Sequence, residues 1–440
     1  MTLARIFERF SDCRPDLAPT RFGILESCDG GLVEVSGLPV PVGSLCTIEH
    51  EPTEMRRAEV IGFRDGRAIL SLLGEAVSLA PGARVRASAR PGMLPVGEAF
   101  LGRAVDGLAQ PVDGRPPPRP DAEWPANGKR VGPLDRASVT TPLATGIRAI
   151  DGLLTTGIGQ RMGIVAGSGV GKSVLMDMIV KGAESDVVVV GLIGERAREV
   201  SDFVRRHMHG NLAARTAIVA VPADDAPNLR LRGALQATAL AEYFRAQGRR
   251  VLLLLDSLTR VAHAAREIAL MLGESGAARG YPPSALGTIT RLCERAGNSA
   301  QSGGSITAFY TVLADGDDAN DPVVDTARAI LDGHIVLSRA RAQRGCYPAI
   351  DVPASISRTM MDIAPPEQVA AARSLRALIA TYDENRDLLA MGAYRSGADA
   401  ILDRAVERQA EIETFLAQDR DVRVAPGQVM TELNRALGHE

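Results

Sequence analysis

Ala166-Gly-Ser-Gly-Val-Gly-Lys-Ser173 is the stretch of this chain that decides its fold. The apolar run GIVAG, which begins at Gly163, leads into it, and the apolar run SVLMDMIV, which begins at Ser173, follows it. The order predicts a strand, a glycine-rich turn and a helix. Such a turn wraps backbone N–H groups around a phosphate, and the positive end of the helix points at the same anion. The stretch therefore predicts a binding site for a nucleoside triphosphate.

The loop residues have separate expected roles. We expect Lys172 to reach the β- and γ-phosphates and the hydroxyl of Ser173 to ligate Mg²⁺, so ATP and Mg²⁺ are the expected cofactors. Only three of the 50 basic residues are lysines, which indicates that Lys172 is kept where a guanidinium does not fit. The alternative is a glycine-rich turn that ends in a solvated lysine. The predicted nucleotide-binding residues are Gly167, Ser168, Gly169, Val170, Gly171, Lys172, Ser173 and Val174.

A second signal is an aspartate at the end of an apolar run, Arg250-Val-Leu-Leu-Leu-Leu-Asp256. An aspartate that ends a buried strand is a common means of holding the Mg²⁺ shell opposite a phosphate loop. Asp256 also precedes Ser-Leu-Thr-Arg, so it could instead cap a helix. With the phosphate loop upstream, the sequence favours the metal role.

A third signal is the charged cluster Gly194-Glu-Arg-Ala-Arg-Glu199, which ends the apolar run DVVVVGLIG. We expect Glu195 at the carboxyl-terminal edge of a strand beside the loop strand, where it could polarise the attacking water. General-base assistance of this kind contributes about 10²–10⁴ in rate. Taken alone, such a cluster is more often the solvated start of a helix.

Composition excludes several classes of protein. The 440 residues carry 50 basic and 53 acidic side chains, and a formal net charge of -3 gives no electrostatic footprint for nucleic acid or an anionic membrane. A local basic groove stays possible. The five cysteines lack a C-x-x-C spacing and the six histidines form no metal-like cluster, which predicts reduced thiols and surface imidazoles. We find no signal peptide or membrane-length apolar run, so we expect a soluble, intracellular protein.

The texture of the chain changes along its length. Leu3, Ile6, Phe7 and Phe10 have helical spacing and predict a short amphipathic helix that either packs on the body or docks on a partner. Alternating runs separated by turns then predict a small antiparallel barrel. Apolar strands that alternate with helices predict an α/β core with a parallel sheet, and a 3.6-residue period after Pro365 predicts a helical domain. The predicted division is 1–19 amphipathic segment, 20–92 barrel, 93–140 connecting segment, 141–364 nucleotide-binding domain and 365–440 helical domain.

Taken together, these motifs resemble a known family. The chain is similar to the hexameric rotary-type ATPases, in the branch that powers flagellar and type III protein export, which are related to the catalytic β subunits of ATP synthases. The resemblance covers about 400 residues and implies a RecA-like P-loop NTPase core. The segments that carry it are AGSGVGKS, GLIGERAREV, LLLLDSLTR, GYPPS (280–284), GSITAFYTVL (304–313), DGHIVLSRA and YPAIDVPASISR (347–358).

The resemblance implies further site residues. Glu195 would activate water, Arg196 would help to hold the γ-phosphate and Glu199 would support the metal shell. Tyr347 would stack on adenine, although packing in the core is the alternative. Arg358 would reach the active site of the neighbouring subunit, where a fixed guanidinium is worth about 10³–10⁵ in kcat; the alternative is a plain surface arginine.

The branch of the family and the partners are implied in the same way. Gly-Ala-Tyr at 392–394 and the helical segment after it look more like flagellar export ATPases than injectisome ATPases, which remain the alternative. The implied partners are further copies in a homohexamer, a regulator or stator-like protein at the N-terminal segment, a central stalk protein, export chaperones, export substrates and the membrane export gate. No nucleic acid is expected. The implied location is the cytoplasm, peripheral to the export apparatus of the inner membrane.

Two other classes of function compete with an ATPase. A non-catalytic nucleotide-binding ring subunit would lack the glutamate found at position 195. A ring-shaped RNA translocase would need stacking aromatics and basic residues in its barrel, and Phe22 and Phe63 are the only aromatic residues between 21 and 90. The sequence therefore favours an ATP-hydrolysing enzyme.

Overall fold

The computed structural model describes residues 22–50, 54–74, 79–87, 91–129, 131–313 and 321–439 of the chain. The chain divides into two compact units, residues 1–92 and residues 93–440, and each is described here by itself. The amphipathic helix predicted at Leu3–Phe10 lies outside the described residues.

The first unit is a closed antiparallel barrel, as the alternating runs predict. Its six strands are hydrogen-bonded in the order β1-β2-β5-β4-β3-β6. Alternation explains the closure: Val33 and Val35 on β2 are fully buried in the barrel core, while the alternating residues Leu32, Glu34 and Ser36 are half-buried on the other face. The strands are β1 (Phe22–Asp29), β2 (Leu32–Ser36), β3 (Leu45–His50), β4 (Glu54–Arg64), β5 (Arg67–Leu72) and β6 (Arg84–Ala87).

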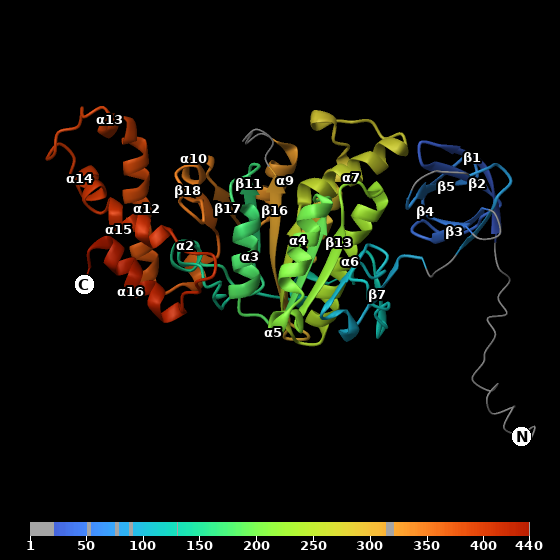
Figure 1. The fold of residues 1–440 in the computed structure, drawn as a ribbon, viewed down its shortest axis with the longest axis horizontal. Coiled ribbons are helices and arrows are strands. Elements are labelled where there is room, and N and C mark those ends of the chain that lie inside the picture. The colour runs from blue at the N-terminus through green and yellow to red at the C-terminus, as the bar shows by residue number, and fades with distance from the viewer. Residues whose placement is uncertain are drawn as a thin grey trace, which may run out of the picture. The chain divides into compact units, whose positions relative to one another are not determined.

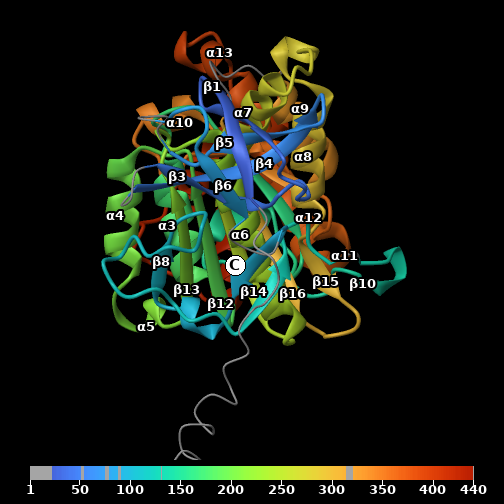
Figure 2. The same cartoon turned by 90° about the vertical axis from the view of Figure 1, so that its right-hand side faces the viewer.

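The second unit is built on a ten-stranded sheet whose main path runs β18-β17-β11-β16-β14-β12-β13-β8 (Figures 1 and 2). All neighbours from β17 to β8 are parallel, and β18 pairs with β17 in the antiparallel direction. The strands of this unit are β7 (Met93–Val96), β8 (Arg103–Val105), β9 (Ala122–Pro125), β10 (Arg136–Ala137), β11 (Arg161–Ala166), β12 (Val187–Ile193), β13 (Thr216–Val221), β14 (Arg250–Asp256), β15 (Gly297–Ser299), β16 (Ser305–Leu313), β17 (Gly333–Leu337) and β18 (Ile350–Ser357).

Helices cover both faces of the sheet, which is why the central strands are apolar throughout. Every residue of β12 and β13 is buried. On one face α6 comes so close that a Cβ on Gly191 would lie 3.1 Å from the Cβ of Ala237. The helices of this layer and its connections are α2 (Arg148–Leu153), α3 (Lys172–Gly182), α4 (Ala197–His207), α5 (Gly210–Ala213), α6 (Pro227–Ala246), α7 (Leu258–Met271), α8 (Pro283–Cys293), α9 (Pro322–Ile330) and α10 (Arg339–Gln343), with short 3-10 turns at Glu98–Phe100, Pro133–Asp135 and Ala278–Gly280.

The sheet order corrects one sequence-based expectation. We expected Glu195 on a strand directly beside the loop strand, but β16 and β14 lie between β11 and β12. The reason is that β14 and β16, which follow β12 in the chain, pair between it and β11. Strand order cannot be derived from chain order in a parallel sheet because every connection passes over a face.

The C-terminal helices pack around α2, and the longest of them, α12, begins at Pro366. Pro366 occupies the first turn of α12, where its missing N–H costs nothing. The periodic residues Leu375, Leu378 and Ile379 are buried in one continuous core with the sheet. In contrast, Ile401 and Val406, which continue the same helical spacing in the sequence, are exposed. The helices are α11 (Met360–Ile363), α12 (Pro366–Glu384), α13 (Arg386–Ala390), α14 (Ala400–Glu407), α15 (Gln409–Leu416) and α16 (Pro426–Leu437).

The two units together answer two predictions about titratable side chains. The described cysteines are free thiols, in agreement with the sequence. The expectation of surface imidazoles is wrong for His207, which is fully buried at the end of α4, stacked on Phe203 and 2.8 Å from a carboxylate oxygen of Asp177. In the part of the chain that the structure describes, no helix combines the length and the apolar character needed to cross a membrane.

Candidate active site

The phosphate loop is the predicted turn, and it lies between the predicted strand and the predicted helix. β11 ends at Ala166 and α3 begins at Lys172. Gly169 and Gly171 have φ angles of 77° and 94°, in the left-handed region that glycine adopts without steric cost. These two glycines turn the backbone so that the loop opens toward the N-terminus of α3, where the helix dipole favours an anion.

Lys172 joins the loop to two acidic side chains from other strands. Its Nζ lies 2.5 Å from Oδ1 of Asp256, at the end of β14, and 3.2 Å from Oε1 of Glu195, just after β12. Burial lowers the pKa of Lys172, but attraction from the two carboxylates outweighs it, so the pKa lies above its ordinary value. The ammonium therefore stays charged at neutral pH and offsets part of the negative charge of the two acids.

Asp256 is held in place by a residue that the sequence analysis missed. The hydroxyl of Thr311, on the neighbouring strand β16, donates a hydrogen bond of 2.5 Å to the same carboxylate oxygen that contacts Lys172. Thr311 is fully enclosed, with 1% of its surface exposed. The available signal was a hydroxyl near the carboxyl end of an otherwise apolar strand, in SITAFYTVL.

Glu195 follows a tight turn at Gly194, whose φ is 70°. A Cβ at Gly194 would lie 2.7 Å from the Cβ of Arg260 on α7, so glycine lets the two segments touch. Burial and the nearby Asp256 raise the pKa of Glu195, while Lys172 opposes the shift. Sequence reasoning missed Arg260, although it ends the DSLTR motif.

A cavity of about 180 Å³ connects the carboxylates with the start of α3. It brings Ser173, Glu195, Glu199 and Asp256 to one space, as the metal and water roles require. Their oxygens are hard donors of the type that Mg²⁺ prefers. The sequence did not anticipate the remaining wall of the cavity, which consists of Met176, Leu192, Val200, Asp202, Phe203 and Arg206.

Arg196 stands apart from this cavity. Its side chain is 84% exposed, and its guanidinium lies 3.7 Å from the carboxylate of Glu199 in the first turn of α4. It lies next to Glu195 in sequence but faces solvent here. An interaction with phosphate would require its side chain to change rotamer.

Tyr347 lies directly beside the phosphate loop. A methyl group on Gly171 would be 3.1 Å from Cε1 of the tyrosine ring. The ring is 40% exposed and borders a cavity of about 730 Å³ together with Val174 of α3. The other walls, which sequence reasoning missed, come mostly from the helical region: Arg148, Gly345, Thr414, Ala417, Gln418, Asp419, Arg420 and Val422.

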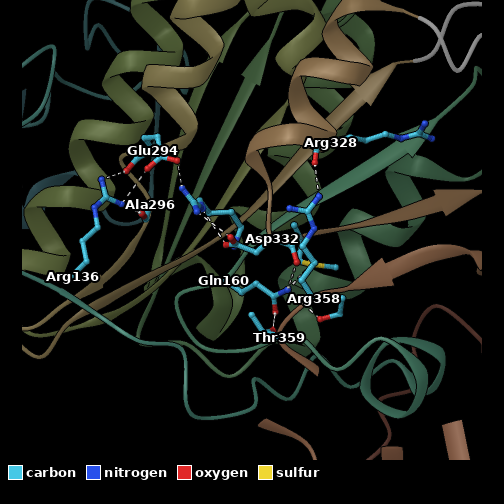
Figure 3. Close-up of polar contacts among 11 residues, drawn as sticks. Arg136, Gln160, Glu294, Ala296, Arg328, Asp332, Arg358 and Thr359 are labelled. Atoms are coloured by element: carbon cyan, nitrogen blue, oxygen red, sulfur yellow. Dashed lines mark hydrogen bonds and ion pairs between the residues drawn. The ribbon is translucent and has the colours of Figure 1, made fainter. Parts of the chain in front are cut away.

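Arg358 and the phosphate loop of its own chain lie at opposite ends of the sheet strands. Arg358 follows Ser357, which pairs with Gly333, and Gly333 pairs with Met162 near the start of β11. The loop leaves the other end of β11, about 16 Å away at the rise of a strand. The exposed guanidinium donates a hydrogen bond of 3.0 Å to the backbone oxygen of Arg328 (Figure 3).

Comparison with known proteins identifies the family. Residues 146–357 match the ATP synthase alpha/beta family, nucleotide-binding domain, and residues 364–435 match the T3SS EscN ATPase C-terminal domain. The flagellum-specific ATP synthase of Salmonella typhimurium is 48% identical over 411 residues, which cover 91% of this chain and 90% of the relative. The type 3 secretion system ATPase of Xanthomonas euvesicatoria is 45% identical over 402 residues, covering 91% and 90%.

The chain belongs to the flagellar and type III secretion ATPase family. Its fold agrees with that of the assembled ATPase EscN from the type III secretion system of enteropathogenic E. coli, with a TM-score of 0.88 at 37% identity, covering 94% of this chain and 100% of that one. EscN in complex with its central stalk EscO gives a TM-score of 0.86 at 36% identity, with the same coverage. The protein is therefore an ATPase with the predicted barrel, P-loop core and C-terminal helices.

Proposed function

We propose that this export ATPase hydrolyses MgATP in a homohexameric ring whose active sites are shared between neighbouring copies, and that it energises protein export through a flagellar type III apparatus. The observation that carries the proposal is the contact of Lys172 with both Asp256 and Glu195 at the mouth of the phosphate loop. This arrangement would bring a phosphate ligand, Lys172, into contact with a metal ligand, Asp256, and a general base, Glu195.

ATP would bind across the two cavities that flank α3. The loop from Gly167 to Ser173 would hold the phosphates with its backbone N–H groups, and Lys172 would exchange its carboxylate partners for β- and γ-phosphate oxygens. The base would enter the larger cavity between Val174 and Tyr347, where an aromatic face can stack on adenine. The position of the tyrosine ring beside Gly171 supports this assignment.

The residues present fit a magnesium ion that arrives with the nucleotide. Mg²⁺ in such sites uses one or two protein oxygens and takes the rest from phosphate and water. We assign the Ser173 hydroxyl and the Asp256 carboxylate as its protein ligands, with Glu199 supporting the shell. Among the described residues no three acidic, histidine or cysteine side chains gather into a metal cage. When bound, the ion would neutralise charge on the β- and γ-phosphates.

Glu195 is the best candidate for the general base. Once Lys172 turns to phosphate, Glu195 loses its closest cation and can accept a proton from the attacking water. Its raised pKa makes it a better base than an ordinary glutamate. Arg196 would swing from the surface to help hold the γ-phosphate.

The position of Arg358 supports a ring with shared sites. Its guanidinium is exposed, and its backbone lies about 16 Å along the sheet from the loop of its own chain. The phosphate group that it would serve therefore belongs to a neighbouring copy. In that site it would stabilise charge on the equatorial oxygens of the transferring phosphoryl group. The solved structure of EscN is that of the assembled ATPase, which agrees with this proposal.

Several finer points belong to the same proposal. The flagellar branch is favoured by the 48% identity to the Salmonella protein and by the Gly-Ala-Tyr segment at 392–394; an injectisome is the alternative. The presence of Glu195 argues against a non-catalytic subunit. We propose a cytoplasmic ring, peripheral to the inner-membrane export apparatus, with a stalk like that named for EscN, a regulator at the N-terminal segment, and chaperones, substrates and the export gate at the C-terminal helices.

A complementation experiment tests the shared site. Glu195→Gln and Arg358→Ala should each bind ATP but lose turnover. Mixing the two inactive proteins should restore activity, because about one interface in four then pairs an intact Glu195 with an intact Arg358 in a head-to-tail ring. Arg291→Ala, which removes an exposed arginine on α8, is the matched control for loss of a surface charge. Native turnover by Arg358→Ala alone would refute the shared site.

A further inference from the structure

Gln160 is a fully buried polar residue immediately before the loop strand β11. Its Oε1 accepts hydrogen bonds of 2.7 Å from the backbone N–H of Gly157 and 2.7 Å from the hydroxyl of Thr359. Its Nε2 donates to the backbone oxygen of Asp332 at 3.2 Å and to Oγ of Ser357 at 3.1 Å. The donor and acceptor sides of the amide are thus both committed.

These contacts involve the residues that precede and follow Arg358 in the sequence. Ser357 and Thr359, its two neighbours, both bind the Gln160 amide (Figure 3). The backbone N–H of Arg358 donates 2.9 Å to the oxygen of Asp332, the same oxygen that Gln160 contacts. One amide therefore fixes the backbone on both sides of the arginine.

The anchor itself is rigid. The carboxylate of Asp332 accepts three hydrogen bonds of 3.0 Å from Arg161, which follows Gln160: one from the backbone N–H and two from the guanidinium. The exposed Arg358 guanidinium, in contrast, has one contact with a backbone oxygen of Arg328. The backbone at Arg358 is held firmly while its side chain can still move to another partner.

We infer that Gln160 is a positioning residue that aims Arg358 at the active site of the neighbouring copy. This inference rests on the proposed role of Arg358. A backbone error of about 1 Å at a catalytic group can cost about 10²-fold in rate. Loss of the amide contacts should therefore reduce kcat although Gln160 touches neither nucleotide nor reacting atoms.

Gln160→Met is the direct variant because it keeps the length of the side chain and removes the amide. We expect ATP affinity of the chain to stay at the native value, KM to change little, and kcat to fall at least tenfold toward the level of Arg358→Ala. Thr359→Val removes one contact at the surface side of the amide and gives a second, gentler variant. Arg136→Ala is the control, since Arg136 contacts Glu294 and Ala296 in the same corner (Figure 3).

Directional complementation separates positioning from a general effect on the fold. In a mixture of Arg358→Ala and Glu195→Gln chains, only the Glu195→Gln chain supplies the arginine. Adding Gln160→Met to that chain should abolish the restored activity, whereas adding it to the Arg358→Ala chain should leave the restored activity unchanged.

Each other outcome overturns a defined statement. Loss of activity in both placements would show that Gln160 supports its own phosphate loop or the fold, and retention in both would show that the amide is dispensable. Either result refutes the inference and leaves the shared site intact. If the parent mixture itself restores nothing, the shared site fails, and the inference fails with it.

Discussion

Tyr347 and Arg358 lie just beyond the two ends of β18, the outermost strand of the central sheet. They are therefore at opposite ends of the sheet strands. Tyr347 precedes the strand and meets Gly171 of its own phosphate loop. Arg358 follows the strand, beside the start of β11. Because β18 is antiparallel to β17, its start lies at the loop end of the parallel strands; under the proposed function, a segment of twelve residues serves the chain's own nucleotide at one end and a neighbour's nucleotide at the other.

Replacement of Tyr347 should separate binding of the base from chemistry. We expect Tyr347→Ala to weaken ATP binding by roughly 1–3 kcal/mol, the range for stacking of a base on an aromatic ring, and to raise KM with little change in kcat. Tyr347→Phe is the matched control and should retain native affinity because the ring is kept. Titration calorimetry measures the ATP affinity of both variants. Equal losses of affinity in Tyr347→Ala and Tyr347→Phe would assign the effect to the hydroxyl instead.

Two glycines of the loop give a second test. Gly169→Ala and Gly171→Ala both place a side chain at positive φ, which costs roughly 1–2 kcal/mol. Only the Gly171 substitution also pushes a methyl group to 3.1 Å from Tyr347, whereas the space around Gly169 is open. We therefore expect the larger loss of ATP affinity for Gly171→Ala, and a loss in the double variant Gly171→Ala/Tyr347→Ala that is smaller than the sum of the two single losses. Equal losses in the two single variants would contradict the contact.

The local features of the site were predictable from sequence because each depends on few neighbouring residues. The turn from Gly167 to Ser173 needs glycines at fixed positions, and Asp256 closes an apolar run, so both stand out without knowledge of the fold. Tyr347 and Arg358 came from family resemblance alone. Nothing in their local sequence shows that they lie at opposite ends of the sheet strands.

The missed features are those that long-range packing creates. Strand β18 contains Pro353, which argues against a strand in a sequence, and the edge position removes the objection because the proline needs no partner. Thr311 and Gln160 have ordinary surroundings in sequence and acquire their roles through contacts with Asp256 and Ser357, more than fifty and nearly two hundred residues away. Such pairs follow only from the assembled sheet.

The pH dependence of turnover should report Glu195. Burial and Asp256 raise its pKa above the ordinary value of 4.5, and Glu199 adds to the rise. A general base acts when deprotonated, so kcat/KM should fall on the acid side at a higher pH than for an ordinary glutamate. Glu199→Gln removes one negative neighbour and should move this acid limb to lower pH, whatever its effect on the rate.

The control for the pH test is Asp202→Asn, which removes another acid from the wall of the same cavity. We expect its acid limb to stay at the native position, because Asp202 is not among the charges that shift Glu195. If the acid limb of the kcat/KM profile is unchanged in Glu199→Gln, Glu195 is not the group whose protonation limits turnover in acid.

Behind the loop helix, a buried contact between a carboxylate and an imidazole ties α3 to α4. Asp177 lies 2.8 Å from His207 and 2.8 Å from Lys181, and both of its carboxylate oxygens are engaged. Burial alone would raise the pKa of Asp177, but hydrogen bonds from His207 and Lys181 lower it to about 2. Because its pKa is lowered on folding, Asp177 stabilises the fold above its unfolded value of about 3.8, and this contribution is lost as the pH falls toward 2.

His207→Leu should therefore destabilise the protein at neutral pH by up to about 3 kcal/mol, because it leaves a buried carboxylate with only Lys181 as partner. The double variant Asp177→Leu/His207→Leu removes the charge as well, so its unfolding midpoint should lie above that of His207→Leu. Thermal unfolding followed by circular dichroism compares the three proteins. A double variant less stable than the single one would mean that the site depends on packing of the imidazole against Phe203 and not on the charge of Asp177.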